Sequence, residues 1–393
     1  MRVLIISNLF PPFFVGGYEI AAKDTADLLV DRGHECTVLT SDFVNAQPAS
    51  DREAYPVHRT LQLHYSWEPL RVVGSPVAQV EAHNEGEVHR VLASVAPDVV
   101  YFWNVFGLGV SPLRAVRSAG LPATMHLMDV VLAGYDLTVA NLRKKWRGES
   151  DYPLCRLGRY VRNKISSSQY IADHFTTMGA HASSVIHPFV EPAPSAGAKQ
   201  RYELGLPIRA VYVGQIERHK GVDLLCEALR RINRETTWTV SLHIFGRSGT
   251  GLDTALKAEF GEMIRIVSGM PRLQILERLS TYDIGFFPST FPEPFGVAQL
   301  ELMYAGLPVI SSGQGGSREA LSPSNSLRFE SGSVADLCAK TVQLIRDYPQ
   351  IAERLGTQAA RDVRERFNKQ GYVTRVEAHL ASIVRAPPGR GRA

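Results

Sequence analysis

The sequence predicts an α/β protein with two Rossmann-like domains, each built on a parallel sheet. Short apolar runs alternate with amphipathic helical stretches along most of the chain, as in parallel sheets with helical crossovers. The 393 residues are too many for one core and suit two domains of ordinary size. A proline-rich stretch over 188–200 separates two such series, so we expect domains over 1–190 and 200–368.

In the first series, each expected strand leads into a helical stretch. Residues 3–6 form the first expected strand, and an amphipathic helix over 18–31 follows and closes at Gly33. A second helix is expected over 108–118. The remaining expected strands of this series cover residues 33–39, 97–102, 122–126, 164–168 and 184–187.

The second series repeats this alternation after the proline-rich stretch. Its expected helices lie at 222–232, 295–305, 350–367 and 372–384, with Gly306 closing the second of them. The tail over 386–393 is rich in Arg, Pro and Gly, so we expect it to be disordered. The expected strands of this series cover residues 209–213, 239–246, 264–267, 283–288 and 308–312.

Composition excludes several classes of protein. Hydrophobic residues make up 45% and charged residues 21% of the chain, the balance of a soluble globular protein. A net charge of +4 is too small to indicate a nucleic-acid partner, although anionic substrates or lipid headgroups stay open. The four cysteines form no C-x-x-C pair, which is typical of reduced cytosolic thiols.

No targeting or spanning segment is expected. The chain opens directly into a strand-like run, and no stretch approaches the ~20 apolar residues of a membrane span. We therefore expect a cytoplasmic protein, at most peripheral at the inner membrane face. The basic stretch over 141–164, dense only at 143–147, suits a membrane-surface or anionic acceptor patch, but a solvated loop and helix face is the simpler interpretation.

The most informative stretch lies between the expected strands at 283–288 and 308–312. Its loop follows the carboxyl end of a strand, where open α/β sheets bind ligands. A helix begins there. Helix N-termini suit a diphosphate because they offer free N–H groups and the positive end of the helix dipole. Glu293 precedes this helix, Gly296 is expected in its first turn, and Glu301 follows about two turns later.

A second loop, 214–221, carries two cations directly after a strand and before a helix. Arg218 and Lys220 therefore predict a phosphate site in which side-chain cations and backbone amides act together. Basic residues in a loop are also often merely solvated, so this loop carries less weight alone.

These motifs resemble those of a known family. Glu293 to Glu301, followed by 305–309 and 315–319, resembles the E-x7-E signature of retaining GT-B glycosyltransferases of the GT4 family, glycosyl transferases group 1. The resemblance implies a GT-B fold whose two domains face a cleft, with a final helix at about 370–385 packing back onto the first domain. It also implies transfer of a hexosyl group from a nucleotide-diphosphate sugar to an acceptor, with retention of anomeric configuration and by front-face attack.

The resemblance assigns roles in the second domain. Glu293 would contact the donor sugar and Glu301 the nucleotide ribose. Lys220 would stabilise the departing diphosphate, whereas the family's arginine position is Gln215, a neutral residue for which Arg218 would have to substitute. The diphosphate would be held by the amides of Phe295, Gly296 and Val297. From its own position, next to Gly269 after an expected strand, Met270 is expected to border the base.

In the first domain the resemblance assigns fewer residues. Gly16 and Gly17 would let the backbone approach the donor phosphate or the acceptor, although a simple turn explains them equally well. His126, at a strand end, would be catalytic, although a lone histidine there is more often structural. The family usually has Asp directly after this histidine, but here Asp129 lies three residues on.

The acceptor and some alternatives stay open. The sequence does not distinguish a lipid-linked glycan, a polysaccharide, a natural product or a protein as acceptor. It contains no Asp-x-Asp pair, so no metal cofactor is expected. Because Gln215 and Asp129 depart from the family pattern, a non-catalytic nucleotide-sugar-binding partner is an alternative, as is a GT-B-fold epimerase. A nicotinamide dehydrogenase is disfavoured because no G-x-G-x-x-G follows a first strand.

Overall fold

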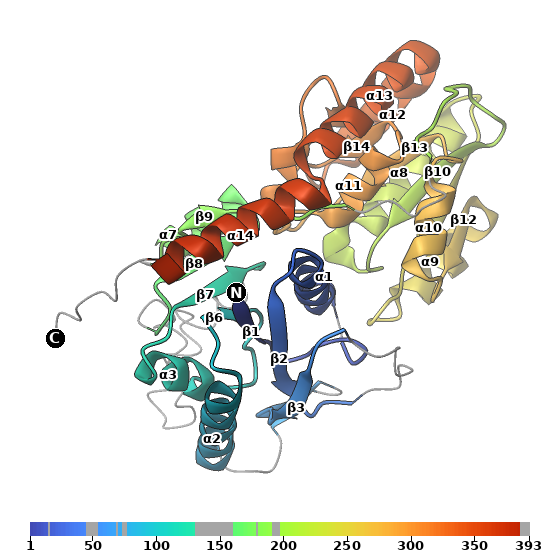
Figure 1. Cartoon of the computed structure of the whole chain (residues 1–393). Coiled ribbons are helices and arrows are strands. Elements are labelled where there is room, and N and C mark those ends of the chain that lie inside the picture. The colour runs from blue at the N-terminus through green and yellow to red at the C-terminus, as the bar shows by residue number, and fades with distance from the viewer. Residues whose placement is uncertain are drawn as a thin grey trace. The chain divides into compact units, whose positions relative to one another are not determined.

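The computed structural model describes residues 1–14, 16–44, 54–67, 70–72, 77–129, 160–177, 180–190 and 197–385. The chain divides into two compact units (Figure 1). Unit 1 is formed by residues 1–187 together with the C-terminal segment from Tyr372, and unit 2 by residues 188–371. The basic cluster at 143–147 and the tail at 386–393, singled out in the sequence, lie outside the described residues.

Unit 1 is built on a parallel sheet. Its described strands are ordered β3-β2-β1-β6-β7-β8-β9, and β1 pairs with β2 on one side and β6 on the other. A separate antiparallel pair is formed by β4 (Tyr65–Trp67) and β5 (Leu70–Val72). The strands of the parallel sheet are β1 (Arg2–Ile6), β2 (Glu35–Ser41), β3 (Val57–Leu61), β6 (Val99–Phe102), β7 (Ala123–Leu127), β8 (Asn163–Ser166) and β9 (Ser184–Val185).

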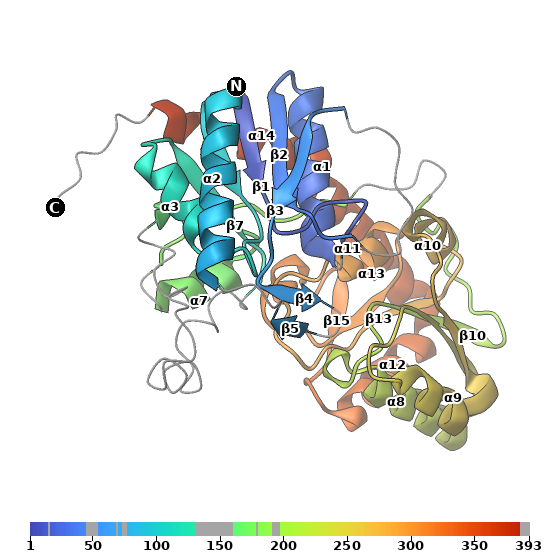
Figure 2. The same cartoon turned by 90° about the horizontal axis from the view of Figure 1, so that it is seen from below.

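Helices cover both faces of this sheet. In Figures 1 and 2, α2 and α3 lie on one face and α1 and α14 on the other. Alternate residues of each strand point to opposite faces, so Leu4 and Ile6 share a core with α2 and α3. The described helices of unit 1 are α1 (Gly17–Asp31), α2 (Val77–Val95), α3 (Ser111–Ser118), α7 (Gln169–Thr177) and α14 (Lys369–Arg385).

The C-terminal helix α14 is fastened to unit 1 by buried polar contacts. The Tyr372 hydroxyl lies 2.8 Å from the Thr25 hydroxyl of α1. The imidazole of His379, buried to 6% exposure, bridges the hydroxyls of Thr124 on β7 and Ser184 on β9, at 2.8 and 2.9 Å. The last helix is therefore an integral layer of the first unit.

Unit 2 repeats the architecture with a second parallel sheet, ordered β12-β11-β10-β13-β14-β15. Its strands are β10 (Ile208–Val213), β11 (Val240–Phe245), β12 (Ile264–Val267), β13 (Ile284–Phe287), β14 (Val309–Ser311) and β15 (Ser326–Arg328). Its helices are α8 (Val222–Glu235), α9 (Leu252–Phe260), α10 (Arg272–Leu279), α11 (Val297–Tyr304), α12 (Val334–Arg346) and α13 (Tyr348–Arg366), with 3₁₀ turns η2 (Arg218–Lys220), η3 (Gly261–Met263) and η4 (Gly316–Ala320).

Two hydrophobic layers enclose the sheet of unit 2. Residues of α8, α9 and α12 pack with Ala210 and Tyr212 on one face. Residues of α10, α11 and α13 pack with Val211 on the other. This arrangement confirms the predicted fold class of two Rossmann-like parallel-sheet units. None of the described helices is long and apolar enough to cross a membrane.

One predicted helix begins later than the sequence indicated. The stretch over 108–118 becomes helical only at Ser111, because Gly109 adopts a left-handed conformation with φ of +79°. A side chain at Gly109 would also collide with Glu81, whose carboxylate accepts hydrogen bonds from the amides of Val110 and Ser111. The Glu81 carboxylate thus binds the first amides of α3, which an earlier helical turn would otherwise have to satisfy.

Candidate functional site

Three loops meet at one edge of the unit 2 sheet. They span residues 214–221, 288–296 and 312–317, and they follow β10, β13 and β14. These strands are neighbours in the sheet, in the order β10-β13-β14. Because all three run parallel, their carboxyl ends and the loops that follow lie side by side.

The first two loops are joined by backbone contacts. Gly221 has φ of +70°, and a side chain there would lie 2.1 Å from the carbonyl oxygen of Pro288. The carbonyl of His219 accepts hydrogen bonds from the amides of Thr290 and Phe291, at 3.0 and 3.1 Å. Glycine at 221 thus allows close approach, and the contacts bring Lys220 to the second loop.

Lys220 and Glu293 form the central ion pair of the site. The Lys220 ammonium lies 2.8 Å from one oxygen of the Glu293 carboxylate and 3.0 Å from the other. The carboxylate side chain is 8% exposed and the lysine side chain 21%. The two residues are 73 positions apart and were predicted separately as site residues. In the structure they form one ion pair.

The third loop fixes the backbone of Glu293. The Glu293 amide donates to the carbonyl of Gln314 at 3.2 Å, and the Gly316 amide donates to the carbonyl of Glu293 at 2.7 Å. Between them, Gly315 has φ of +64°, and a side chain there would lie 2.5 Å from the Glu293 carbonyl oxygen. Glycine 315 is needed both for its conformation and for this approach.

We expect Gly315→Ala to destabilise unit 2 and displace Glu293. Alanine at this positive φ, with ψ of −139°, costs ~1–3 kcal/mol, and the contact with Glu293 adds to this cost. Gly332→Ala is the matched control, because Gly332 has φ of +82° but no atom within 4 Å of its added Cβ. Thermal unfolding of both variants should show the larger loss for Gly315→Ala. Equal losses would show that the contact with Glu293 is unimportant.

Helix α11 begins at the centre of these loops. Gly296 was predicted in its first turn but is instead the residue before it, with φ of +89° and ψ of 60°. The prediction was wrong because this left-handed glycine ends the loop and delays the helix to Val297, which is half-buried. The first amides of α11 have no carbonyl partner within the helix, so they supply positive potential beside Glu293.

A buried amide holds α11 against the third loop. Gln299 is 0% exposed, accepts a hydrogen bond from the Ser311 hydroxyl at 2.6 Å and donates to the carbonyl of Ser317 at 2.9 Å. Phe295, one of the predicted diphosphate-binding residues, packs its ring against Phe367. The start of α11 is therefore rigidly positioned.

Glu301 has a partner that the sequence did not indicate. The Arg272 Nε, on α10, donates to Glu301 Oε1 at 2.6 Å. The Glu301 side chain is 6% exposed and that of Arg272 is 44% exposed. An isolated basic residue after Met270-Pro271 was the available signal, but only the packing of α10 beside α11 connects it to the site.

The remaining predicted donor residues lie around this edge. Gln215 is exposed, and its backbone carbonyl accepts a hydrogen bond from the Tyr212 hydroxyl. Arg218, 80% exposed, pairs with Asp223 at 2.9 Å. Met270 is half-buried against the core that contains α10 and α11. Arg218 is thus directed to a carboxylate on α8, and Lys220 is the cation paired with Glu293.

In unit 1, the predicted residues cluster around the start of α1. Gly16 precedes α1 and its amide donates to the Glu19 carboxylate at 2.9 Å. A side chain at Gly17 would meet nothing within 4 Å, so packing inside unit 1 does not require glycine there. The hydroxyl of the next residue, Tyr18, donates to the carbonyl of His126, which links the two predicted sites.

His126 is buried among aromatic residues that the sequence did not connect to it. Its side chain is 2% exposed, its Nδ1 lies 2.7 Å from the Tyr101 hydroxyl, and its ring stacks on Trp103 at 4.3 Å between centroids. Burial, with a smaller contribution from His379, lowers the pKa of His126 to about 3. The imidazole is therefore neutral at physiological pH and suited to hydrogen bonding.

Unit 1 is expected to lose stability as the pH falls below about 6.5, the pKa of an unfolded histidine. Burial lowers the folded-state pKa of both His126 and His379, so the unfolded chain binds more protons in this range. Each such histidine costs about 1.4 kcal/mol per pH unit until its folded-state pKa is reached. Urea unfolding between pH 7.5 and 5.5 measures the slope.

Replacing both histidines with glutamine should flatten this pH dependence. The exposed His89 serves as the control, because His89→Gln should leave the slope unchanged. An unaltered slope in the double variant would contradict the assignment of the pH dependence to these two side chains.

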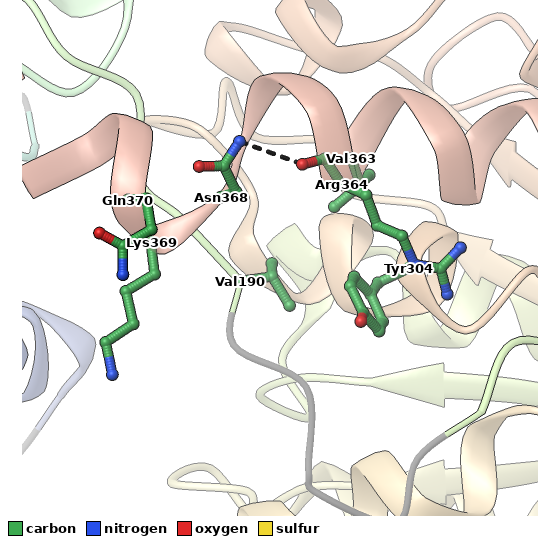
Figure 3. Close-up of a pocket in the computed structure, with 7 residues that line it drawn as sticks. All are labelled: Val190, Tyr304, Val363, Arg364, Asn368, Lys369 and Gln370. Carbon is green, nitrogen blue, oxygen red and sulfur yellow. Dashed lines mark hydrogen bonds between the residues drawn. The ribbon is translucent and has the colours of Figure 1, made fainter.

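A separate small pocket lies at the junction of α13 and α14. It has a volume of about 230 Å³, and the Arg364 guanidinium packs over the Tyr304 ring at its wall (Figure 3). Its lining includes none of the predicted site residues and consists of Val190, Tyr304, Val363, Arg364, Asn368, Lys369 and Gln370. No group of three or more His, Cys, Asp or Glu side chains suited to a metal ion occurs among the described residues.

Comparison with known proteins agrees with this architecture. Residues 200–362 match the family model of glycosyl transferases group 1. The chain is 26% identical to glycogen synthase of Mycobacterium tuberculosis, over 95% of this chain and 93% of that one. Two solved structures have similar folds. Anabaena Alr3699/HepE in complex with UDP and glucose gives a TM-score of 0.71 at 20% identity, covering 97% of this chain and 100% of that one. Sucrose-phosphate synthase from Thermosynechococcus elongatus gives 0.72 at 15% identity, covering 97% and 98%.

The two sheets and these structural similarities define a GT-B fold. Residues 200–362 form a group 1 glycosyltransferase domain. The family resemblance of the stretch from Glu293 to Glu301 is thereby confirmed.

Proposed function

We propose that this chain transfers a hexosyl group from a nucleotide-diphosphate sugar with retention of anomeric configuration and without a metal ion, as in the GT4 family. The observation that carries the proposal is the Lys220–Glu293 ion pair beside the N-terminus of α11. A leaving diphosphate needs compensating positive charge, which Lys220 and the α11 amides would supply in place of a metal. HepE, solved with UDP and glucose, suggests uridine nucleotides as the first donors to test.

The proposed reaction follows from the placement of the two carboxylates. Glu293 would accept hydrogen bonds from donor-sugar hydroxyls, and Glu301 from the ribose hydroxyls. The bond from the anomeric carbon to the phosphate oxygen breaks, and the acceptor oxygen bonds to the same face. The acceptor proton passes to the leaving phosphate oxygen. No protein nucleophile is required.

The test is product analysis with UDP-, GDP- and ADP-linked hexoses in the presence of EDTA. We expect one donor to release its nucleoside diphosphate, slowly into water and faster once an acceptor is supplied. NMR of the freshly formed sugar should show the anomer of the donor. Inverted product, or dependence on added Mg²⁺, would contradict the proposal.

A second function is favoured by one specific observation. Gln215 is neutral and Arg218 pairs with Asp223, so Lys220 would bear the stabilisation of the diphosphate without help from either. A chain with weakened stabilisation of this kind would bind nucleotide sugars without cleaving them. Donor binding without any release of diphosphate identifies that function, and an isomerised nucleotide sugar would identify an epimerase.

A further inference from the structure

The imidazole of His126 contacts two fully buried aromatic residues, Tyr101 and Trp103. Tyr101 lies in β6, and Trp103 follows that strand directly. Both have 0% exposure, and they lie 5.4 Å apart between ring centroids. The Tyr101 hydroxyl reaches Nδ1 of His126 at 2.7 Å, while Trp103 stacks on the imidazole at an angle of 25°.

The direction of the hydrogen bond follows from counting hydrogens. Within the described part of the chain, the Tyr101 hydroxyl has Nδ1 of His126 as its one hydrogen-bonding partner. If Nδ1 carried a proton, it would donate to the Tyr101 oxygen, and the phenolic hydrogen would be buried without an acceptor. Buried polar hydrogens are rarely left in that state. The Tyr101 hydroxyl therefore donates, and Nδ1 accepts.

The stacked indole keeps Nδ1 of His126 facing the Tyr101 hydroxyl. A flip of the imidazole would put Cδ2 in the place of Nδ1, and the ring would have to turn against the Trp103 ring at 2% exposure. The Tyr18 hydroxyl also binds the carbonyl of His126 and so fixes the backbone. Because ring and backbone are both fixed, Nδ1 stays bound to the Tyr101 hydroxyl. The other ring nitrogen, Nε2, does not contact this hydroxyl.

We propose that Tyr101 is a positioning residue, whose hydroxyl fixes His126 in the tautomer with its proton on Nε2. In that state His126 is a hydrogen-bond donor toward a ligand oxygen and not an acceptor or a general base. Burial, which keeps the imidazole uncharged, is consistent with this role. The consequence for catalysis rests on the proposed function.

The experiment uses the full chain with ¹⁵N-labelled histidine. Long-range ¹H–¹⁵N spectra distinguish protonated from unprotonated ring nitrogens, and His126→Gln assigns the resonance. We expect wild-type His126 to show an unprotonated Nδ1 and a protonated Nε2 throughout pH 6–8. In Tyr101→Phe, the Nδ1 resonance should shift and the two tautomers should mix.

Tyr372→Phe is the matched control. It also removes a buried tyrosine hydroxyl from unit 1, one that lies 2.8 Å from the Thr25 hydroxyl. Its His126 spectrum should equal that of the wild type. In donor cleavage, Tyr101→Phe should lower kcat about tenfold or more with KM within twofold, while Tyr372→Phe stays within twofold on both.

Two results would overturn the proposal. One is a protonated Nδ1 or an imidazolium in the wild type, and the other is a Tyr101→Phe chain with wild-type spectrum and kcat. If the wild-type chain cleaves no donor, the proposed function fails, but the spectrum still decides the tautomer. The two failures are therefore distinguishable.

Discussion

Replacing Lys220 with alanine is expected to lower the rate of donor cleavage about a hundredfold or more, because one preorganised positive group at the leaving diphosphate is lost. The variant also leaves the Glu293 carboxylate, 8% exposed, without its cation. We expect a stability loss of ~2 kcal/mol, below the ~3–5 of a fully buried pair, since Lys220 is partly exposed. Steady-state kinetics on folded protein and urea unfolding measure the two effects separately.

Lys199→Ala is the control for this prediction. The Lys199 ammonium lies 3.3 Å from Asp283 and 2.7 Å from the carbonyl of Tyr282, and both charged side chains are 8% exposed. Asp283 directly precedes β13, whereas Glu293 lies in the loop that follows this strand, so the two pairs are at opposite ends of β13. Its removal should lower stability at least as much while leaving the rate per folded molecule unchanged. A rate loss equal to that of Lys220→Ala would assign the effect to stability alone.

Replacing Glu301 with glutamine should weaken donor binding about tenfold or more. The substitution keeps the shape of the side chain but removes the charge, and charge-assisted hydrogen bonds contribute ~1.5–3 kcal/mol each. The partner Arg272, 2.6 Å away, would lose its carboxylate and keep only a weaker acceptor. The loss should appear in the Kd of both the nucleoside diphosphate and the intact donor.

The Arg272→Met variant separates the pairing of Glu301 with Arg272 from its proposed contact with the nucleotide. If Arg272 only orients the carboxylate, its loss should weaken nucleotide binding less than the loss of Glu301 itself. Glu262→Gln, which alters an exposed carboxylate in η3, should leave the Kd unchanged. Unchanged affinity in Glu301→Gln would remove Glu301 from the binding site.

The sequence predicted the parts of the fold and site that depend on local pattern. The strand β12 covers the predicted residues 264–267, and Gly306, with φ of +75°, ends α11 as expected. Lys220 and Glu293 were each recognisable because a charged residue followed a buried strand. Their contact could not be derived from spacing, because it depends on β10 and β13 being adjacent in the sheet.

The residues that were missed act through packing between distant segments. Arg272 meets Glu301 only because α10 and α11 cover the same sheet face. Tyr101 was predicted only as part of a buried strand, and no local pattern indicated that it and Trp103 would enclose His126. The left-handed Gly296 was misplaced by one position because helical periodicity continued through it.

Calorimetric titration of a panel of nucleoside diphosphates, with EDTA present, tests the donor site most directly. We expect one of them to bind the wild-type chain without metal, and to bind Lys220→Ala and Glu301→Gln at least about tenfold more weakly, as the loss of one charged hydrogen bond implies. Binding that is absent from the wild type, or unaltered in both variants, would contradict the site built around the Lys220–Glu293 pair.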